Sequence, residues 1–114
     1  MVDMNIDVPG TRARLGVTIQ EMTPQLAAYF GAKEGVLVSS VSDDSPASRA
    51  GLKAGDVIAS VDGRKVATRI DLVSVLREAK DRQDVSIVIL RERRENTVKA
   101  TLERPERFYS NRSL

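Results

Sequence analysis

One stretch of the sequence, residues 45–63, constrains the local structure more than any other. It reads Ser-Pro-Ala-Ser-Arg-Ala-Gly-Leu-Lys-Ala-Gly-Asp-Val-Ile-Ala-Ser-Val-Asp-Gly. Ser45 is suited to cap a helix whose first residue is proline, and Gly51 can end that helix. Gly55 then allows a turn into an apolar strand, which an Asp-Gly pair closes. The stretch therefore predicts a short helix, a tight turn and a strand, in that order.

With this stretch in place, the sequence resembles a PDZ domain, specifically the bacterial type attached to serine proteases of the HtrA/Deg family. The resemblance covers about residues 12–103. It implies an α+β fold, a PDZ-like partly open antiparallel β-barrel or sandwich of five to six strands capped by two to three helices. It also implies a module that binds extended peptides, usually at a free C-terminus. Residues 1–11 and 104–114 are expected to be a flexible lead-in and a flexible C-terminal tail.

The remaining elements follow from periodicity. Alternating apolar and polar residues indicate half-buried strands, and apolar residues recurring at three- and four-residue intervals indicate helices. The helix at residues 23–30 is expected to pack into the core. A polar connection at residues 93–96 is expected to join the last two strands in a hairpin. The predicted strands are 15–20, 35–41, a short one containing Val66, 85–92 and 97–103, and the other predicted helices are 23–30 and 68–79.

Size and charge argue for one domain that does not bind nucleic acid. The 114 residues include 18 basic and 16 acidic side chains, so the net charge is only +2, and aromatic residues make up 4%. Few aromatic rings leave few surfaces for stacking bases. Arg91, Arg93 and Arg94 alternate with Glu92 and Glu95, a pattern that favours a solvated hairpin over a phosphate-binding patch.

Catalysis and metal binding are not expected. The chain has no histidine and no cysteine. Without histidine it cannot form a Ser-His-Asp triad, and without cysteine it has no thiol nucleophile and no disulfide. Both of the usual zinc ligands are missing. Asp43 and Asp44 are expected to form a solvated turn. A Ser-Lys dyad remains formally open, but one small domain leaves no room for a catalytic fold. We therefore expect a binding domain without catalytic residues, cofactor or metal.

The resemblance assigns one wall of a peptide groove to the first predicted strand and the turn before it. The segment Arg-Leu-Gly-Val at residues 14–17 occupies the place of the carboxylate-binding loop of PDZ domains. Gly16 suits this role, because a residue without Cβ lets consecutive N–H groups turn toward a terminal carboxylate. An ordinary strand start is the alternative. The residues expected to bind peptide on this side are Arg14, Leu15, Gly16, Val17, Thr18, Ile19 and Gln20.

The resemblance assigns the other wall to the helix at residues 68–79. Arg69 would lie at its start, Val73 one turn on, and Leu76 beside an apolar pocket for the terminal residue of the peptide. Many eukaryotic PDZ domains have a histidine at the position of Arg69 that accepts a Ser or Thr hydroxyl. A guanidinium only donates, so an acidic or tolerant subsite is expected. The alternatives are a solvated Arg69 and a Leu76 that serves the core.

The C-terminal tail ends in Leu114, the kind of residue that an apolar PDZ pocket accepts. One hypothesis is therefore that Leu114 docks in the groove of a neighbouring molecule, and the alternative is a disordered tail. No apolar run approaches the 18 residues of a membrane span, and residues 1–10 lack the basic start of a signal peptide. The chain is expected to be a piece of a longer protein.

Three functions fit these features. The first is the substrate-recruiting or regulatory PDZ domain of a bacterial envelope serine protease, located by family resemblance in the periplasm or cell envelope. The second is a non-proteolytic adaptor or scaffold that tethers a partner protein. The third is a PDZ insert of a membrane-embedded protease. All three share a groove for C-terminal or extended hydrophobic peptides, so the residues upstream in the full-length protein would have to separate them.

Overall fold

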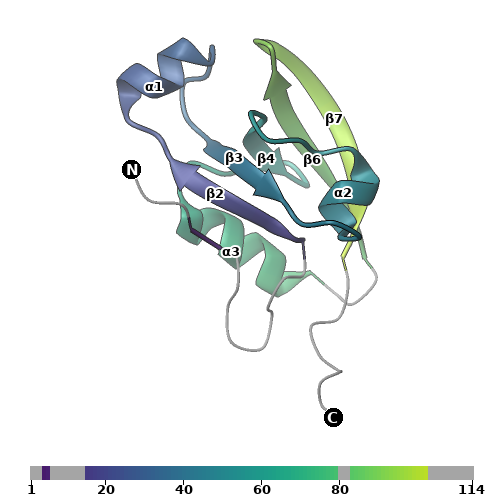
Figure 1. Ribbon diagram of the computed structural model, residues 1–114. Helices are drawn as coiled ribbons and strands as arrows, with labels where there is room; N and C mark the ends of the chain where they lie inside the picture. Colours follow the sequence, from purple (N-terminus) through teal and green to yellow (C-terminus); the bar gives the residue numbers. More distant parts are fainter. Residues whose placement is uncertain (1–3, 6–14, 80–82, 103–114) are drawn as a thin grey trace.

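The computed structural model describes residues 4–5, 15–79 and 83–102 of the chain. Its secondary structure comprises short helices and strands that alternate along the chain (Figure 1). The described helices are α1 (Pro24–Tyr29), α2 (Pro46–Ala50) and α3 (Arg69–Glu78). The described strands are β1 (Met4–Asn5), β2 (Val17–Glu21), β3 (Val36–Val41), β4 (Val57–Val61), β5 (Arg64–Lys65), β6 (Asp84–Arg91) and β7 (Arg94–Thr101).

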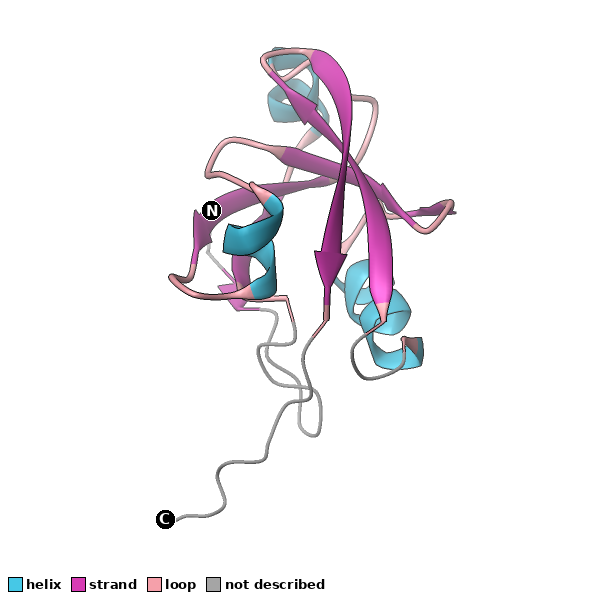
Figure 2. Ribbon diagram, turned by 90° about the vertical axis from the view of Figure 1, so that its right-hand side faces the viewer, coloured by secondary structure: helices cyan, strands magenta, loops and turns pink. Residues whose placement is uncertain are grey.

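All of these strands belong to one antiparallel sheet with the order β1-β2-β3-β4-β6-β7, and β5 pairs with β4. The sheet is open and strongly twisted, and the long β6–β7 hairpin crosses the other strands (Figure 2). α3 packs against β2, and α2 packs against β7. The predicted α+β class with a partly open antiparallel sheet and three helices is confirmed. β1 is an element that the sequence does not predict.

The stretch 45–63 folds as its residues predict. Ser45 caps α2, with its Oγ accepting a hydrogen bond from the Ser48 N–H at 3.1 Å. Gly51 ends the helix with a φ of 93°. At the far end, Asp62 and Gly63 have φ values of 51° and 80° and form the tight turn between β4 and β5. The predicted helix, turn and strand are confirmed.

Two predicted strand boundaries are wrong. The short strand after this turn is β5, and Val66 lies just beyond it, buried in the core. The connection between β6 and β7 is a two-residue turn at Glu92 and Arg93 rather than the predicted residues 93–96, and Arg94 already pairs with Arg91. Glu92 and Arg93 adopt φ values of 53° and 66°. Positive φ at both turn residues matches the twist of the strands, so two non-glycine residues tolerate it here.

α1 contributes less to the core than predicted. Of its residues only Ala27 is buried, while the side chain of Tyr29 is 70% exposed. Phe30, at the helix end, packs edge-to-face on Tyr29 with ring centroids 5.2 Å apart. Thr23 caps the helix, since its Oγ1 accepts a hydrogen bond from the Leu26 N–H. α1 is thus correctly placed in sequence but lies at the periphery.

The core lies between the sheet, α2 and α3. Every second residue of β2 and β6 points into it, because strand side chains alternate between faces. The helix α3 adds one apolar face, as its spacing predicts. The largest fully buried side chains are Leu15, Ile19, Val36, Val38, Val57, Ile58, Val61, Val66, Leu72, Ile87, Ile89 and Leu102.

Candidate functional site

Gly16 forms the turn that leads into β2, and no other residue type fits there. Its φ is +88°, in the left-handed region. A Cβ at this position would lie 2.3 Å from the Cβ and 2.7 Å from the Oγ of Ser45. Ser45 is itself buried and held in place by a 2.7 Å bond from its Oγ to the Ser42 carbonyl. Conformation and close packing therefore both require glycine.

The two carbonyl groups of this turn are held by α2 and by the residue that follows β3. The Leu15 carbonyl accepts from the Ala47 N–H at 2.9 Å, and the Gly16 carbonyl accepts from the Ser42 N–H at 2.9 Å. In a trans peptide the N–H points opposite to the C=O. The Gly16 N–H therefore points away from Ala47, and the Val17 N–H points away from Ser42. Two consecutive N–H groups around a left-handed residue form a nest that suits an anion such as a carboxylate.

β2 continues from this turn with β3 along one edge and the two-residue strand β1 along the other. Ser39 Oγ donates to the Thr18 carbonyl at 3.1 Å, which places that carbonyl on the side of β3. The Ile19 N–H belongs to the same peptide group as that carbonyl and points to the other edge. On that edge Ile19 pairs with Met4, while the register with β3 shifts between Thr18 and Ile19. Side chains alternate across the sheet instead: Val17 and Ile19 are buried, and Thr18 and Gln20 are half-buried.

α3 lies against β2 and is anchored to it at its N-terminus. The Arg69 N–H donates to the Glu21 carboxylate at 2.8 Å. Thr68 and Asp71 form a capping box, in which the Asp71 carboxylate accepts from the N–H groups of Ala67 and Thr68 at 2.9 and 3.1 Å. These two backbone donors lower the pKa of Asp71 below its ordinary value. The end of β2 and the start of α3 are thereby held together.

The predicted groove residues of α3 share one helix face. Arg69, Val73 and Leu76 are separated by four and three residues, which places them above one another on a helix. Arg69 and Val73 are half-buried, and Leu76 is only 2% exposed. Val73 packs against the core cluster that contains Leu76. Leu76 thus belongs to the core, which does not conflict with the predicted place beside the pocket.

The structure brings most of the predicted site residues to one place. The turn before β2, the strand β2 and the neighbouring α3 carry all of them except Arg14, which lies outside the described residues. The predicted residues on these elements are Leu15, Gly16, Val17, Thr18, Ile19, Gln20, Arg69, Val73 and Leu76. Their peptide-binding role stays a prediction at this point.

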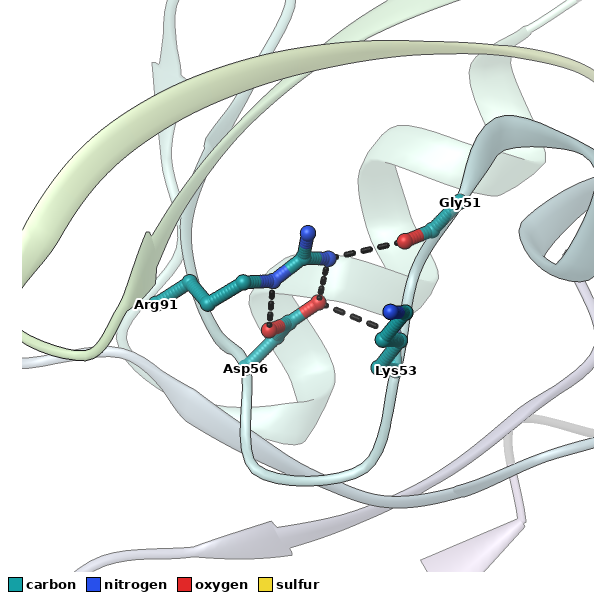
Figure 3. A network of polar contacts seen from close by, with 4 residues as sticks. All are labelled: Gly51, Lys53, Asp56 and Arg91. Carbon is teal, nitrogen blue, oxygen red and sulfur yellow. Dashed lines mark hydrogen bonds and ion pairs between the residues drawn. The ribbon is translucent and has the colours of Figure 1, made fainter.

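Asp56 and Arg91 form a polar network that the sequence does not predict (Figure 3). The guanidinium of Arg91 donates to both carboxylate oxygens of Asp56 at 2.8 and 2.7 Å and to the Gly51 carbonyl at 2.7 Å. The Lys53 N–H completes the set at 2.9 Å. The hydrogen bonds to Asp56 raise the pKa of Arg91. Arg91 was expected on a solvated hairpin, and the buried carboxylate draws it inward instead.

A separate hollow lies at the end of the molecule where α1 meets the β6–β7 hairpin. It has a volume of about 490 Å³ and is lined by Tyr29, Phe30, Gly55, Leu90, Glu92 and Arg93. Arg93 donates to the Tyr29 carbonyl at 2.9 Å and joins the two elements. The hollow shares no residue with the predicted groove.

Within residues 4–5, 15–79 and 83–102, no group of three or more acidic side chains lies close enough to hold a metal ion. No helix of that part of the chain is both long and apolar enough to cross a membrane.

A family model of the PDZ domain matches residues 13–102 of the chain. The chain belongs to the PDZ family. Curated relatives of this PDZ domain are named probable periplasmic serine endoproteases, DegP-like. That of Marinomonas sp. (strain MWYL1) is 39% identical over 95 residues, which are 82% of this chain and 20% of the relative. That of Rickettsia conorii is 38% identical over 87 residues, 75% of this chain and 17% of the relative. The chain thus spans about one fifth of the length of these relatives.

Solved structures agree with this assignment. The HtrA-type protease AlgW with a decapeptide superposes with a TM-score of 0.69 at 34% identity, over 82% of this chain and 30% of that protein. AlgW with a tripeptide gives a TM-score of 0.71 at 32% identity, over 82% of this chain and 32% of AlgW. The PDZ domain of HtrA3, bound to a phage-derived ligand, has the same fold, with a TM-score of 0.68 at 22% identity over 78% and 83% of the two chains. The predicted resemblance to PDZ domains of HtrA/Deg proteases is confirmed.

Proposed function

We propose that this PDZ domain binds the free C-termini of extended peptides by adding them to the edge of β2, beside α3. The observation that carries the proposal is the turn at Gly16. The Leu15 and Gly16 carbonyls are taken up by the N–H groups of Ala47 and Ser42, so the N–H groups of Gly16 and Val17 point away from these partners and can receive a carboxylate. The solved structures of AlgW with a decapeptide and with a tripeptide support a peptide-binding role.

The side chains around this turn have separate roles in the proposal. Thr18, Ile19 and Gln20 present the backbone that pairs with the peptide, as in other cases of strand addition. Leu15, Val17 and Leu76 form the apolar floor for the terminal side chain, and Val73 lines the wall one turn earlier. Arg69 at the start of α3 favours an acidic side chain farther from the terminus.

We further propose that this domain belongs to an HtrA/Deg-type serine protease of the bacterial periplasm, for which it recruits substrates or which it regulates. The DegP-like relatives, which are named periplasmic endoproteases, support this role. A scaffold without protease activity is the alternative. The sequence that precedes residue 1 in the full-length protein separates the two, because the protease requires its own histidine and nucleophilic serine there. Docking of Leu114 in a neighbouring groove concerns residues outside the described part and stays a prediction.

The groove is tested by titrating the chain with hexapeptides that end in Val, Leu, Ile, Ala or Phe. We expect dissociation constants of about micromolar order for the preferred terminus, since a few strand hydrogen bonds and one buried side chain must offset the cost of association. Amidating the same peptide should weaken binding about tenfold or more, because the amide carries no charge for the Gly16 turn. Val73→Ala should also weaken it, whereas the neighbouring Ser74→Ala serves as a control.

Two results would contradict the proposal. Equal binding of the free and amidated peptides would assign the groove to internal segments and remove the role of Gly16. Absence of binding by every hexapeptide, in a chain that remains folded by circular dichroism, would reject peptide binding at this edge.

A further inference from the structure

The edge of β2 that the proposed function requires is already paired within the chain. β3 takes one side of β2. Along the other side lies β1, in an antiparallel ladder that sets Met4 opposite Ile19 and Asn5 opposite Thr18. β1 is the last strand in the order of the sheet on this side. Part of the chain's own N-terminal segment thus occupies the place of an added strand.

The backbone groups that β1 meets are the ones an added peptide needs. The Thr18 carbonyl faces β3, where Ser39 donates to it. The Ile19 N–H, which shares a peptide group with that carbonyl, points to the opposite edge. The register with β3 shifts between Thr18 and Ile19, and on the opposite edge Met4 lies directly across from Ile19. A peptide that pairs with Ile19 therefore competes with β1 for the same edge.

β1 also runs in the direction of a C-terminal ligand. From Met4 to Asn5 its partners change from Ile19 to Thr18, so the segment proceeds toward Gly16. A peptide whose carboxylate reaches the Gly16 turn must follow the same course. β1 differs in one respect: it is internal, and it carries no terminal carboxylate at this point. A free C-terminus has an electrostatic contact that β1 cannot make.

We propose that β1 is an internal competitor that keeps the peptide edge of β2 closed until a C-terminal ligand displaces it. This inference rests on the proposed function. With only two residues in its ladder, β1 holds the edge weakly, whereas a ligand pairs along more of β2 and adds its carboxylate. The apparent dissociation constant is then the intrinsic one divided by the fraction of open molecules. Weak ligands are rejected, and ligands with a free carboxylate are favoured.

The test compares two double variants of the full chain. Met4→Pro with Asn5→Pro removes both backbone N–H groups of β1, while Met4→Ala with Asn5→Ala keeps them. We expect the proline pair to bind Val- and Leu-terminated hexapeptides about three- to thirtyfold more tightly than the alanine pair, because loss of a short ladder opens the edge. Amide hydrogen exchange at Ile19 in the unliganded proline pair should be faster by a similar factor.

Several outcomes overturn the inference. One is a proline pair that binds no more tightly than the alanine pair and leaves exchange at Ile19 unchanged. Another is tighter binding only after deletion of residues 112–114, which would make the C-terminal tail the occupant of the edge. If no hexapeptide binds any variant, the proposed function fails, and exchange at Ile19 still decides whether β1 covers the edge.

Discussion

Two positions of the segment 45–63, Asp56 within it and Ser45 at its start, differ in how the polar groups around them are used. At Asp56, every carboxylate contact described is made within the domain, by Arg91 and by the Lys53 N–H. Around Ser45, the N–H groups of Ala47 and Ser42 take up the carbonyl groups of the Gly16 turn, and the N–H groups of that turn point away from these partners. The first arrangement closes a network, and the second leaves donors for something else.

The residues that identify the family are thus different from the residues proposed to bind peptide. The residues of segment 45–63 build helix α2 and the turns, and they supply Asp56, the buried partner of Arg91. The residues proposed to bind peptide lie on β2 and α3, and segment 45–63 serves them indirectly by packing Ser45 under Gly16. Variants at Asp56 and at Gly16 should therefore separate effects on stability from effects on peptide binding.

The largest effect is expected in the network of Asp56 and Arg91, for Asp56→Ala. Asp56 is 1% exposed, and its loss leaves the guanidinium of Arg91 without its main partner. Because Arg91 retains partial contact with solvent, we expect the free energy of unfolding to fall by about 2–4 kcal/mol. Urea denaturation measures it, with the exposed Asp43→Ala as the control. Unchanged peptide affinity in the folded fraction would sharpen the contrast, and a loss below about 1 kcal/mol would show that the network is dispensable.

An effect of similar size on stability, together with a direct effect on binding, is expected for Gly16→Ala. The left-handed φ and the clash with Ser45 should together cost about 2–4 kcal/mol. Gly63→Ala is the matched control: its φ is +80°, and a Cβ there meets nothing within 4 Å. It should cost only about 1–2 kcal/mol and leave peptide affinity intact. Equal losses of stability and affinity in both variants would refute the special role of the Gly16 turn.

The smallest effect is expected at the start of α3, for Asp71→Asn. The pKa of Asp71 is lowered in the folded protein by the backbone N–H groups of Ala67 and Thr68. Its carboxylate therefore adds stability above the pKa of the unfolded state, and this is lost as the pH falls through the lower folded pKa. The melting temperature of the wild type should exceed that of the variant at neutral pH, and the difference should shrink in acid. A constant difference would refute the assignment, and Asp43→Asn controls for general charge effects.

Local chemistry made much of this fold predictable. Ser45, Gly51 and the Asp62–Gly63 turn each act through the backbone of their own neighbourhood, and all were placed correctly. The error at the β6–β7 turn has the opposite character. Glu92 and Arg93 carry no turn signal, and their positive φ values are imposed by the pairing of the flanking strands. Arg91 was misjudged for a similar reason, since its partner Asp56 lies 35 residues earlier in the chain.

By itself, the sequence determined the family, the order of the main elements and the segments that carry the candidate groove, because caps, glycine turns and apolar periodicity act over a few residues. Only the tertiary structure decided how the Gly16 turn is oriented, that Asp56 binds Arg91, and that β1 lies along β2. Each of these depends on backbone groups brought together from distant parts of the chain. Strand pairing uses atoms that every residue has, so the side-chain pattern at Met4 and Asn5 gives no sign of it.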